Sequence, residues 1–263
     1  MKAPSLKASA ASSLSDNQAI IIVKAAPQLG EKHGETVCTA AITHDRRWVR
    51  LYPIAFRSLD QAQQFKRWDV VDYHWRQPKD DPRVESRRVE NETLTITGSF
   101  PDKQRYGLIS PMVKESLAAE RQAGRSFAFV RPKIRKFIVE KKTDAEFRKE
   151  TEGFKLFANQ GNLFVKQLIP YEPCPFKFKY EYDIADGTRT GTCQDWETEA
   201  TFFLWRKEYG EQKALELMKA RWGKELPDKG ILFAMGTHSL YPDTWLINGI
   251  IQMSEFGQLA LDL

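Results

Sequence analysis

The sequence lacks any apolar run long enough to cross a bilayer, and it has few cysteines. The longest early apolar stretch, residues 19–23, is far shorter than the roughly 18 residues that a membrane-spanning helix needs, so we expect no membrane contact. Residues 1–18 hold two lysines and many small side chains without the apolar core of a secretory signal, and we expect a disordered leader there. Three widely spaced cysteines, Cys38, Cys174 and Cys193, argue against a disulfide framework, so we expect a cytoplasmic protein.

Common enzyme motifs are missing as well. There is no GxGxxG after a predicted strand, no GxxxxGK[ST] phosphate loop, no GxSxG elbow and no HExxH helix. The cysteines show no CxxC spacing of the kind that structural zinc sites use. The sequence therefore indicates no cofactor, and we assign no metal site to it.

The basic residues are concentrated in the middle of the chain. Residues 1–100 hold 15 Lys and Arg against 12 Asp and Glu, residues 101–180 hold 17 against 9, and residues 181–263 hold 8 against 14. Basic charge gathered in one region is typical of proteins that bind phosphates, although uneven charge also arises by chance. The acidic last third is compatible with a metal site, a protein partner or simple solubility.

Short strands separated by turns dominate the expected secondary structure. Alternating and β-branched segments predict several strands before residue 100, together with one short helix from Ser58. We expect an α+β, β-rich fold with two small β-barrels in tandem, the first over residues 19–125 and a barrel-like section over 126–182. An α/β C-terminal portion with two helices and a terminal hairpin is expected over 183–263.

Two later segments show clear periodicity. In FKFKYEY, residues 176–182, aromatic side chains alternate with Lys177, Lys179 and Glu181, which predicts a half-buried strand with a basic outer edge. In residues 211–226, Leu215, Met218 and Trp222 recur at spacings of three and four, which indicates an apolar helix stripe that packs in a core.

Several motifs resemble those of a largely uncharacterised prokaryotic family. They are ETVC in residues 35–38, WVRLYPIAFR in residues 48–57, DPRVES in residues 81–86 and DWE in residues 195–197. What the resemblance implies is a dual OB-type β-barrel architecture with nucleic-acid binding. Relatives with a Cys/His-rich turn before DWE would hold a metal there, but this chain retains only Cys193 at that turn.

The stretch DRRWVRLYPIAFR, residues 45–57, carries the most unusual pattern. On a strand, one face would present Arg46, Trp48, Arg50 and Tyr52, while Val49 and Leu51 on the other face suit a core. Single-stranded nucleic acids are bound by positive grooves and by aromatic rings on which bases stack, and this face supplies both. We therefore expect the face to be open to a ligand.

The nucleic-acid-binding hypothesis extends this face with basic residues of neighbouring segments. The predicted DNA- or RNA-binding residues, for single-stranded or locally opened nucleic acid, are Arg46, Trp48, Arg50, Tyr52, Arg57, Lys66, Arg67, Arg83, Arg87, Lys177 and Lys179. The alternative is that the helix from Ser58 or another domain covers Trp48 and Tyr52, with the arginines paired to nearby carboxylates.

Two further functions stay open. Asp195, Glu197 and His238 form a candidate catalytic set for a metal-assisted nuclease or related phosphodiester hydrolase, in which Mg²⁺ or Mn²⁺ would activate water. The structural alternative is that Asp195 caps a helix and His238 sits on a hairpin. The third hypothesis is a non-catalytic subunit of a larger nucleic-acid-processing or defence complex, whose acidic last third docks a protein partner. Asp80 and Asp81 similarly either ligate a divalent ion or cap a turn.

Overall fold

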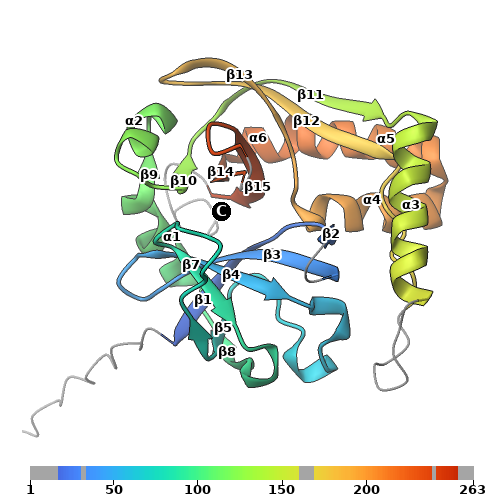
Figure 1. The fold of residues 1–263 in the computed structure, drawn as a ribbon. Helices are drawn as coiled ribbons and strands as arrows, with labels where there is room; N and C mark the ends of the chain where they lie inside the picture. Colours follow the sequence, from blue (N-terminus) through green and yellow to red (C-terminus); the bar gives the residue numbers. More distant parts are fainter. Residues whose placement is uncertain (1–16, 31–33, 160–168, 239–240, 254–263) are drawn as a thin grey trace, which may run out of the picture.

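The computed structural model describes residues 17–30, 34–159, 169–238 and 241–253 (Figure 1). Strands of three sheets and six α-helices lie within these residues, so the predicted α+β, β-rich fold class is confirmed. None of the described helices combines the length and apolarity that a membrane crossing requires.

The first sheet is built by the N-terminal part of the chain and is curled. Its strands are β1 (Gln18–Lys24), β2 (Gln28–Gly30), β3 (Gly34–Ile42), β4 (Trp48–Ile54), β5 (Asp69–Asp72), β6 (Trp75–Arg76), β7 (Ser86–Val89) and β8 (Thr95–Ser99). They run in the order β6-β7-β4-β3-β1-β5-β8, with β2 paired to β3, and only β4 and β7 are parallel. Register shifts of the β-bulge kind interrupt the β1–β3, β3–β4 and β5–β8 pairs, and such shifts bend and twist a sheet.

An apolar cluster that includes Ile21, Leu51 and Phe65 fills the inside of this sheet. Three short 3₁₀ turns lie at its edge: η1 (Phe56–Ser58), η2 (Gln61–Gln63) and η3 (Asn91–Thr93). The predicted helix from Ser58 is therefore wrong. Leu59 has an extended backbone between the first two turns, and this conformation interrupts a continuous helix from Ser58. The side chain of Leu59 is buried.

Two smaller sheets and most of the helices form the rest. The four-stranded sheet has the order β15-β14-β10-β9 and contains β9 (Val113–Lys114), β10 (Phe127–Val130), β14 (Ile231–Thr237) and β15 (Trp245–Gln252). The antiparallel three-stranded sheet contains β11 (Lys133–Lys141), β12 (Phe176–Ile184) and β13 (Gly187–Thr192). The helical segments are α1 (Asp102–Ile109), η4 (Ser110–Met112), α2 (Leu117–Gln122), α3 (Asp144–Asn159), α4 (Trp196–Tyr209), α5 (Glu211–Ala220), the π-turn η5 (Arg221–Glu225) and α6 (Leu226–Lys229).

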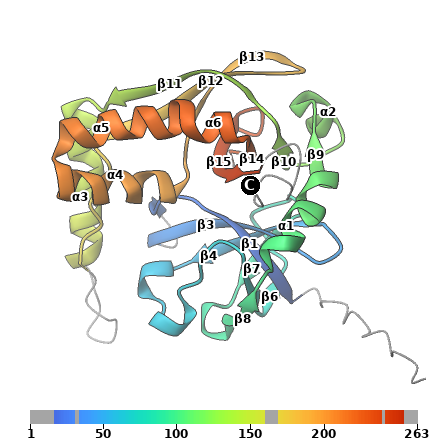
Figure 2. The same cartoon turned by 180° about the vertical axis from the view of Figure 1, so that it is seen from behind.

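The three sheets are stacked in layers. Figures 1 and 2 show the three-stranded sheet on one side, the first sheet on the other, and the four-stranded sheet with α4 to α6 between them. β10 pairs with β14 and β12 pairs with β13, so strands of the predicted sections 126–182 and 183–263 share sheets. The boundaries given to the three parts of the chain stay predictions.

The alternation predicted for residues 176–182 is confirmed in β12. Its aromatic side chains are buried one after another, and Phe178 packs with Phe202 of α4. Met218 of α5 and Trp222 of η5 belong to the same apolar cluster, so the stripe predicted there also lies in a core.

A second face of the first sheet is buried against the four-stranded sheet. Ile20 and Ile22 of β1 point away from Ile21 and share an apolar cluster with Phe129 of β10 and Leu232 of β14. β1 is thus buried on both faces, which explains why its sequence is continuously apolar instead of alternating.

Gly249 of β15 tests this contact between the layers. A Cβ atom at Gly249 would lie 2.5 Å from Cγ2 of Val23 in β1, which is closer than side-chain carbons pack. We expect Gly249→Ala to lower the free energy of unfolding by about 1–3 kcal/mol in urea denaturation. Gly98→Ala on β8 is the control, since a Cβ there meets nothing within 4 Å. Equal stability of the Gly249 variant and the wild-type protein would contradict the packing of β15 on β1.

Candidate functional site

The face of β4 that was expected to be open is partly covered. The half-buried Trp48 ring stacks on Phe127 at 5.1 Å between centroids and lies 4.6 Å from Phe129. Arg50 retains only 7% of its accessible area. The expectation of an open face is therefore wrong for these two residues. The apolar side chains of β10 provide a partner for the indole, and burying an aromatic ring of that size is strongly favourable.

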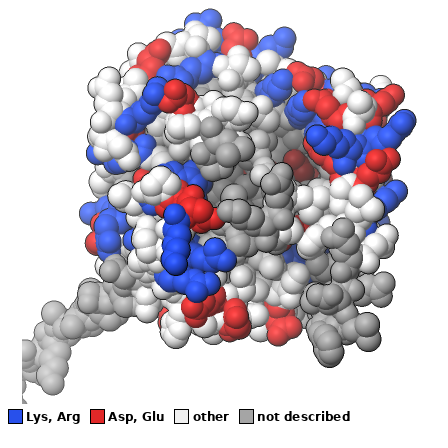
Figure 3. Space-filling model, in the orientation of Figure 1, with Lys and Arg blue, Asp and Glu red and all other residues white. Residues whose placement is uncertain are grey.

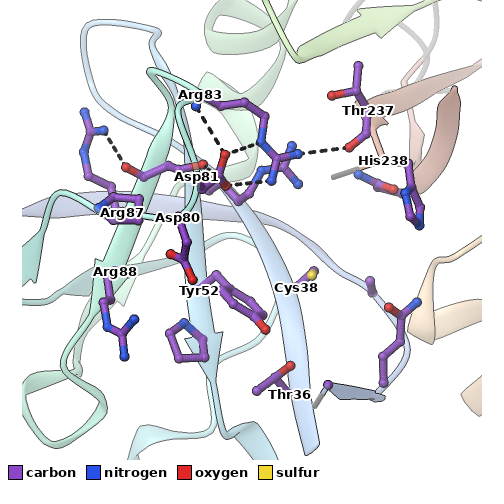
Figure 4. A pocket seen from close by; sticks show the side chains of 18 of the residues that line it. Thr36, Cys38, Tyr52, Asp80, Asp81, Arg83, Arg87, Arg88, Thr237 and His238 are labelled. Carbon is purple, nitrogen blue, oxygen red and sulfur yellow. Dashed lines mark hydrogen bonds and ion pairs between the residues drawn. The ribbon is translucent and has the colours of Figure 1, made fainter. Parts of the chain in front are cut away.

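The rest of this face opens into a cavity of about 410 Å³ between the first sheet and the C-terminal strands (Figure 4). Four arginines line it, Arg50, Arg83, Arg87 and Arg88, and we call it the arginine cleft. Other lining residues come from both halves of the chain: Thr36 and Cys38 of β3, Tyr52 of β4, Ser86 of β7, Gln194, Thr237 and His238 at the end of β14, and Asn248 of β15.

The parallel pairing of β4 with β7 builds one wall of the arginine cleft. In this register Arg50 lies opposite Ser86, and Tyr52 lies opposite Arg88. Because paired residues of neighbouring strands point to the same side, these four side chains share one face of the sheet. The motif WVRLYP and the motif DPRVES thus meet in space although 27 residues lie between them in the sequence.

A tight ion pair organises the loop that precedes β7. Nε and Nη2 of Arg83 donate to the two carboxylate oxygens of Asp81 at 2.7 and 2.6 Å, and the Ser86 hydroxyl donates to the same carboxylate at 2.6 Å. Nη1 of Arg83 donates to the backbone oxygen of Thr237 at 3.2 Å (Figure 4). Burial opposes ionisation of Asp81, yet the hydrogen bonds from Arg83 and Ser86 lower its pKa to about 2. Asp81 therefore stabilises the turn before β7, which is one of the two roles predicted for it; the other was ligation of a divalent ion.

The same loop is joined to β10 through a buried carboxylate. Glu85, 7% exposed, accepts hydrogen bonds from the backbone N–H of Ser126 at 2.9 Å and from its hydroxyl at 3.2 Å. The backbone oxygen of Glu85 accepts from the Arg50 N–H at 2.8 Å. These hydrogen bonds of Glu85 hold the loop to β4 and to Ser126, the residue before β10, beside the cleft.

Two further hollows adjoin the arginine cleft. One, of about 450 Å³, is lined by Arg76, Gln77, Lys79, Asp80 and Arg88. The other, of about 530 Å³, is lined by basic residues Arg46, Arg47, Arg87, Lys114 and Arg125 together with Trp48, Val84, Glu85, Pro111, Met112, Glu120 and Phe127. Arg88 borders the cleft and the first hollow, and Arg87 borders the cleft and the second. Figure 3 shows Lys and Arg side chains gathered on this face over the region of β7.

Three cations in this group have no partner of their own in the part of the chain that the structure describes. The side chains of Arg76, Lys79 and Arg88 form no hydrogen bond or ion pair with any described residue. Arg87 differs, because its Nη1 donates to the backbone oxygens of Val84 and Ser86 and its guanidinium lies 4.0 Å from the centre of the Trp75 ring.

Several predicted binding residues lie outside the cleft and its hollows. Arg57 is paired with Glu35 at 2.7 Å, and Arg67 is paired with Asp195 and Glu197. The exposed Lys66 lines none of the three cavities. Lys177 and Lys179 on the outer face of β12 are paired with Glu146 and Glu140. Apart from Lys66, the structure thus divides the predicted set into residues that line the cavities and residues already matched to carboxylates.

The candidate catalytic set does not assemble. Asp195 caps α4 through the Glu197 N–H at 3.1 Å, accepts the Ile250 N–H at 2.8 Å and pairs with Arg67 at 2.9 Å. His238 instead lines the arginine cleft and accepts from the Tyr241 N–H at 3.3 Å. Among the described residues no group of three or more His, Cys, Asp or Glu side chains is placed to hold a metal ion. Asp195 therefore caps a helix, which was the structural alternative to a catalytic role.

Cys38, which was not among the predicted binding residues, lines the arginine cleft together with Arg50 and Arg83. Burial raises the pKa of its thiol, and the opposing effect of Arg50 and Arg83 is smaller. A thiol in that state is a poor nucleophile at neutral pH. The ETVC motif contains Thr36 and Cys38, but the sequence did not predict that they or Asn248 line a site, since nothing in a single chain shows that β3, β4 and β15 meet at one cavity.

Comparison with known proteins gives family relationships without an activity. Residues 15–114 match the family described as Domain of unknown function (DUF8758), and residues 112–261 match Domain of unknown function (DUF8757). The two matches cover adjacent parts of the chain, in line with the two-part organisation that the resemblance implied. No curated protein matches.

Several chains of solved structures show a low level of similarity to this chain. One of them is described as "Structure and Conformational Change of a Replication Protein A Heterotrimer Bound to ssDNA", with 9% identity and a TM-score of 0.22 over 90% of this chain and 65% of that chain. A likeness of this size does not indicate a shared fold.

The contacts of Asp195 predict a large effect on stability. Its side chain is 3% exposed and that of Arg67 is 13% exposed, and removing one member of a buried pair costs about 3–5 kcal/mol. We therefore expect Asp195→Asn to lower the free energy of unfolding by about 3 kcal/mol or more in urea denaturation. The matched control is Glu197→Gln, whose 51% exposed side chain contacts the same arginine and is expected to contribute about 0–1 kcal/mol. Similar losses in the two variants would contradict this assignment.

The ion pair of Asp81 predicts how stability depends on pH. Its pKa is about 2 in the folded protein against an ordinary value of 3.8, so its carboxylate stabilises the fold above about pH 4. This contribution is lost as the pH falls from about 4 towards 2. We expect the difference in Tm between the wild-type protein and Asp81→Asn to be constant above about pH 5 and to shrink below about pH 4. A difference that stays constant down to about pH 3 would argue against the depressed pKa.

Proposed function

The chain belongs to the family described as Domain of unknown function (DUF8757), whose description names no activity, and we propose that it binds single-stranded or locally opened nucleic acid along the arginine cleft. The observation that carries this proposal is the run of three adjoining cavities. Each has more basic than acidic side chains in its lining, and shared arginines connect them. A positive path of this kind follows a phosphate backbone.

The unmatched cations support the proposal more strongly than the net charge does. Arginines that already contact carboxylates, such as Arg67, have little to gain from a phosphate. The side chains of Arg76, Lys79 and Arg88 have no such contact among the described residues, so a polyanion would provide their first charged partner. Arginine also offers two parallel donors to a phosphate group.

The size of the arginine cleft favours a single strand. Its volume of about 410 Å³ lies in the range of small-ligand sites and is too small to enclose a duplex. Tyr52 in its lining supplies an aromatic ring against which one base can stack, an interaction worth about 1–3 kcal/mol per base. The OB-type character implied by the resemblance belongs to the same proposal, since OB-type sheets bind strands across a curled face. A cytoplasmic location and a protein partner for the acidic last third are also proposals.

A salt titration with paired variants tests the function. Binding of single-stranded DNA and RNA oligonucleotides is measured by fluorescence anisotropy at several salt concentrations. We expect Arg76→Ala/Arg88→Ala to weaken binding roughly tenfold and to reduce the slope of log Kobs against log salt by about 0.7 for each lost contact. Lys213→Ala/Lys224→Ala is the matched control, because it removes the same charge from exposed positions of α5 and η5.

Two results would overturn the proposal. One is an absence of binding by the wild-type protein even at low salt, where electrostatic contacts are strongest. The other is an equal loss of affinity in both double variants, which would mean that total charge and not the arginine cleft determines binding.

A further inference from the structure

Arg50 is a buried cation that no acidic side chain neutralises within the described residues. It is 7% exposed and takes part in no ion pair there. Its Nη2 donates one long hydrogen bond to Oγ of Ser126 at 3.4 Å, and the guanidinium lies 4.1 Å from the centre of the Phe127 ring. Nε of Arg50 has no hydrogen-bond partner among the described residues.

The carboxylates close to Arg50 are bound to other groups. Glu85 accepts from Ser126, and both oxygens of Asp81 accept from Arg83. Burial, reinforced by the charge of Arg83, lowers the pKa of Arg50 to about 10, so the side chain is still charged at neutral pH. A buried charge without a partner is costly, and an anion bound in the cleft would remove that cost.

The surroundings of Arg50 fit a phosphate attached to one nucleotide. Arg50 and Ser86 lie opposite each other on β4 and β7, Tyr52 and Arg88 form the next pair, and all four line the same cavity. The pairing therefore offers two guanidinium groups to an anion and the ring of Tyr52 beside them to a base, while the Ser86 hydroxyl donates to Asp81.

Resting on the nucleic-acid binding proposed above, we infer that the arginine cleft binds the terminal phosphomonoester of a nucleotide. The guanidinium groups of Arg50 and Arg88 donate to the phosphate oxygens, and Tyr52 lies against the base. A terminal phosphate carries between one and two negative charges near neutral pH and so matches two arginines. An internal phosphodiester carries one charge, and its chain would have to enter and leave past the buried Arg50.

The first experiment compares end groups on the wild-type protein. The probes are oligothymidylates of about ten nucleotides, a length within known single-strand site sizes, with a 5′-phosphate, a 3′-phosphate or hydroxyl groups at both ends. Adenosine monophosphate and inorganic phosphate serve as free competitors. We expect one phosphorylated form to bind at least about tenfold more tightly than the hydroxyl form, and adenosine monophosphate to displace it.

The second experiment removes the charge of Arg50. Arg50→Met keeps a long apolar side chain against Phe127, so the ligand-free variant should be at least as stable as the wild-type protein. It should bind phosphorylated and hydroxyl-ended oligonucleotides equally, whereas Lys213→Ala/Lys224→Ala keeps the preference. If Arg50→Met does not fold, the comparison of phosphorylated and hydroxyl-ended oligonucleotides on the wild-type protein decides whether the cleft binds a terminal phosphate.

The outcomes separate this inference from the function on which it rests. Binding of all oligonucleotides with no preference for a phosphorylated end would overturn the inference and leave nucleic-acid binding standing. Binding of adenosine monophosphate without any oligonucleotide would support the phosphate site with a free nucleotide as its source and overturn nucleic-acid binding. A preference that survives in a folded Arg50→Met variant would overturn the role given to Arg50, and binding of no probe would overturn both proposals.

Discussion

The contact between the outer face of the first sheet and β10, β14 and β15 determines most other features of this protein. β1 is apolar on both sides, and one side is buried in the apolar cluster that contains Phe127, Phe129 and Leu232. The same contact covers Trp48 and Arg50 and brings Thr237 and His238 to the mouth of the arginine cleft. Without it the first sheet would expose a large apolar face, and the cleft would have one wall.

Local patterns in the sequence were informative wherever the fold depends on local periodicity. The alternation in residues 176–182 and the helical stripe around Met218 each predicted which side chains are buried, since a strand or helix turns its residues at a fixed period. The role of Asp195 as a helix cap also followed from a local rule, because the carboxylate of a capping residue needs only the next few N–H groups.

The candidate site was predictable only in part, because it depends on contacts between distant segments. The sequence indicated that Arg46, Trp48, Arg50 and Tyr52 share a face, but β10, which covers half of that face, begins almost eighty residues later. Charge was harder still to interpret. Lys177 and Arg88 look alike in a sequence, and only the fold shows that Glu146 neutralises the first while no described residue neutralises the second.

The hydrogen bonds that link Arg50, Ser126 and Glu85 join the two family segments beside the cleft. Arg50 and Glu85 belong to the segment of residues 15–114, and Ser126 belongs to that of residues 112–261. Neither segment has this contact by itself. A change of Glu85 in the first segment would leave the buried N–H of Ser126 in the second without its acceptor, so we expect these two positions to covary among relatives that carry both segments.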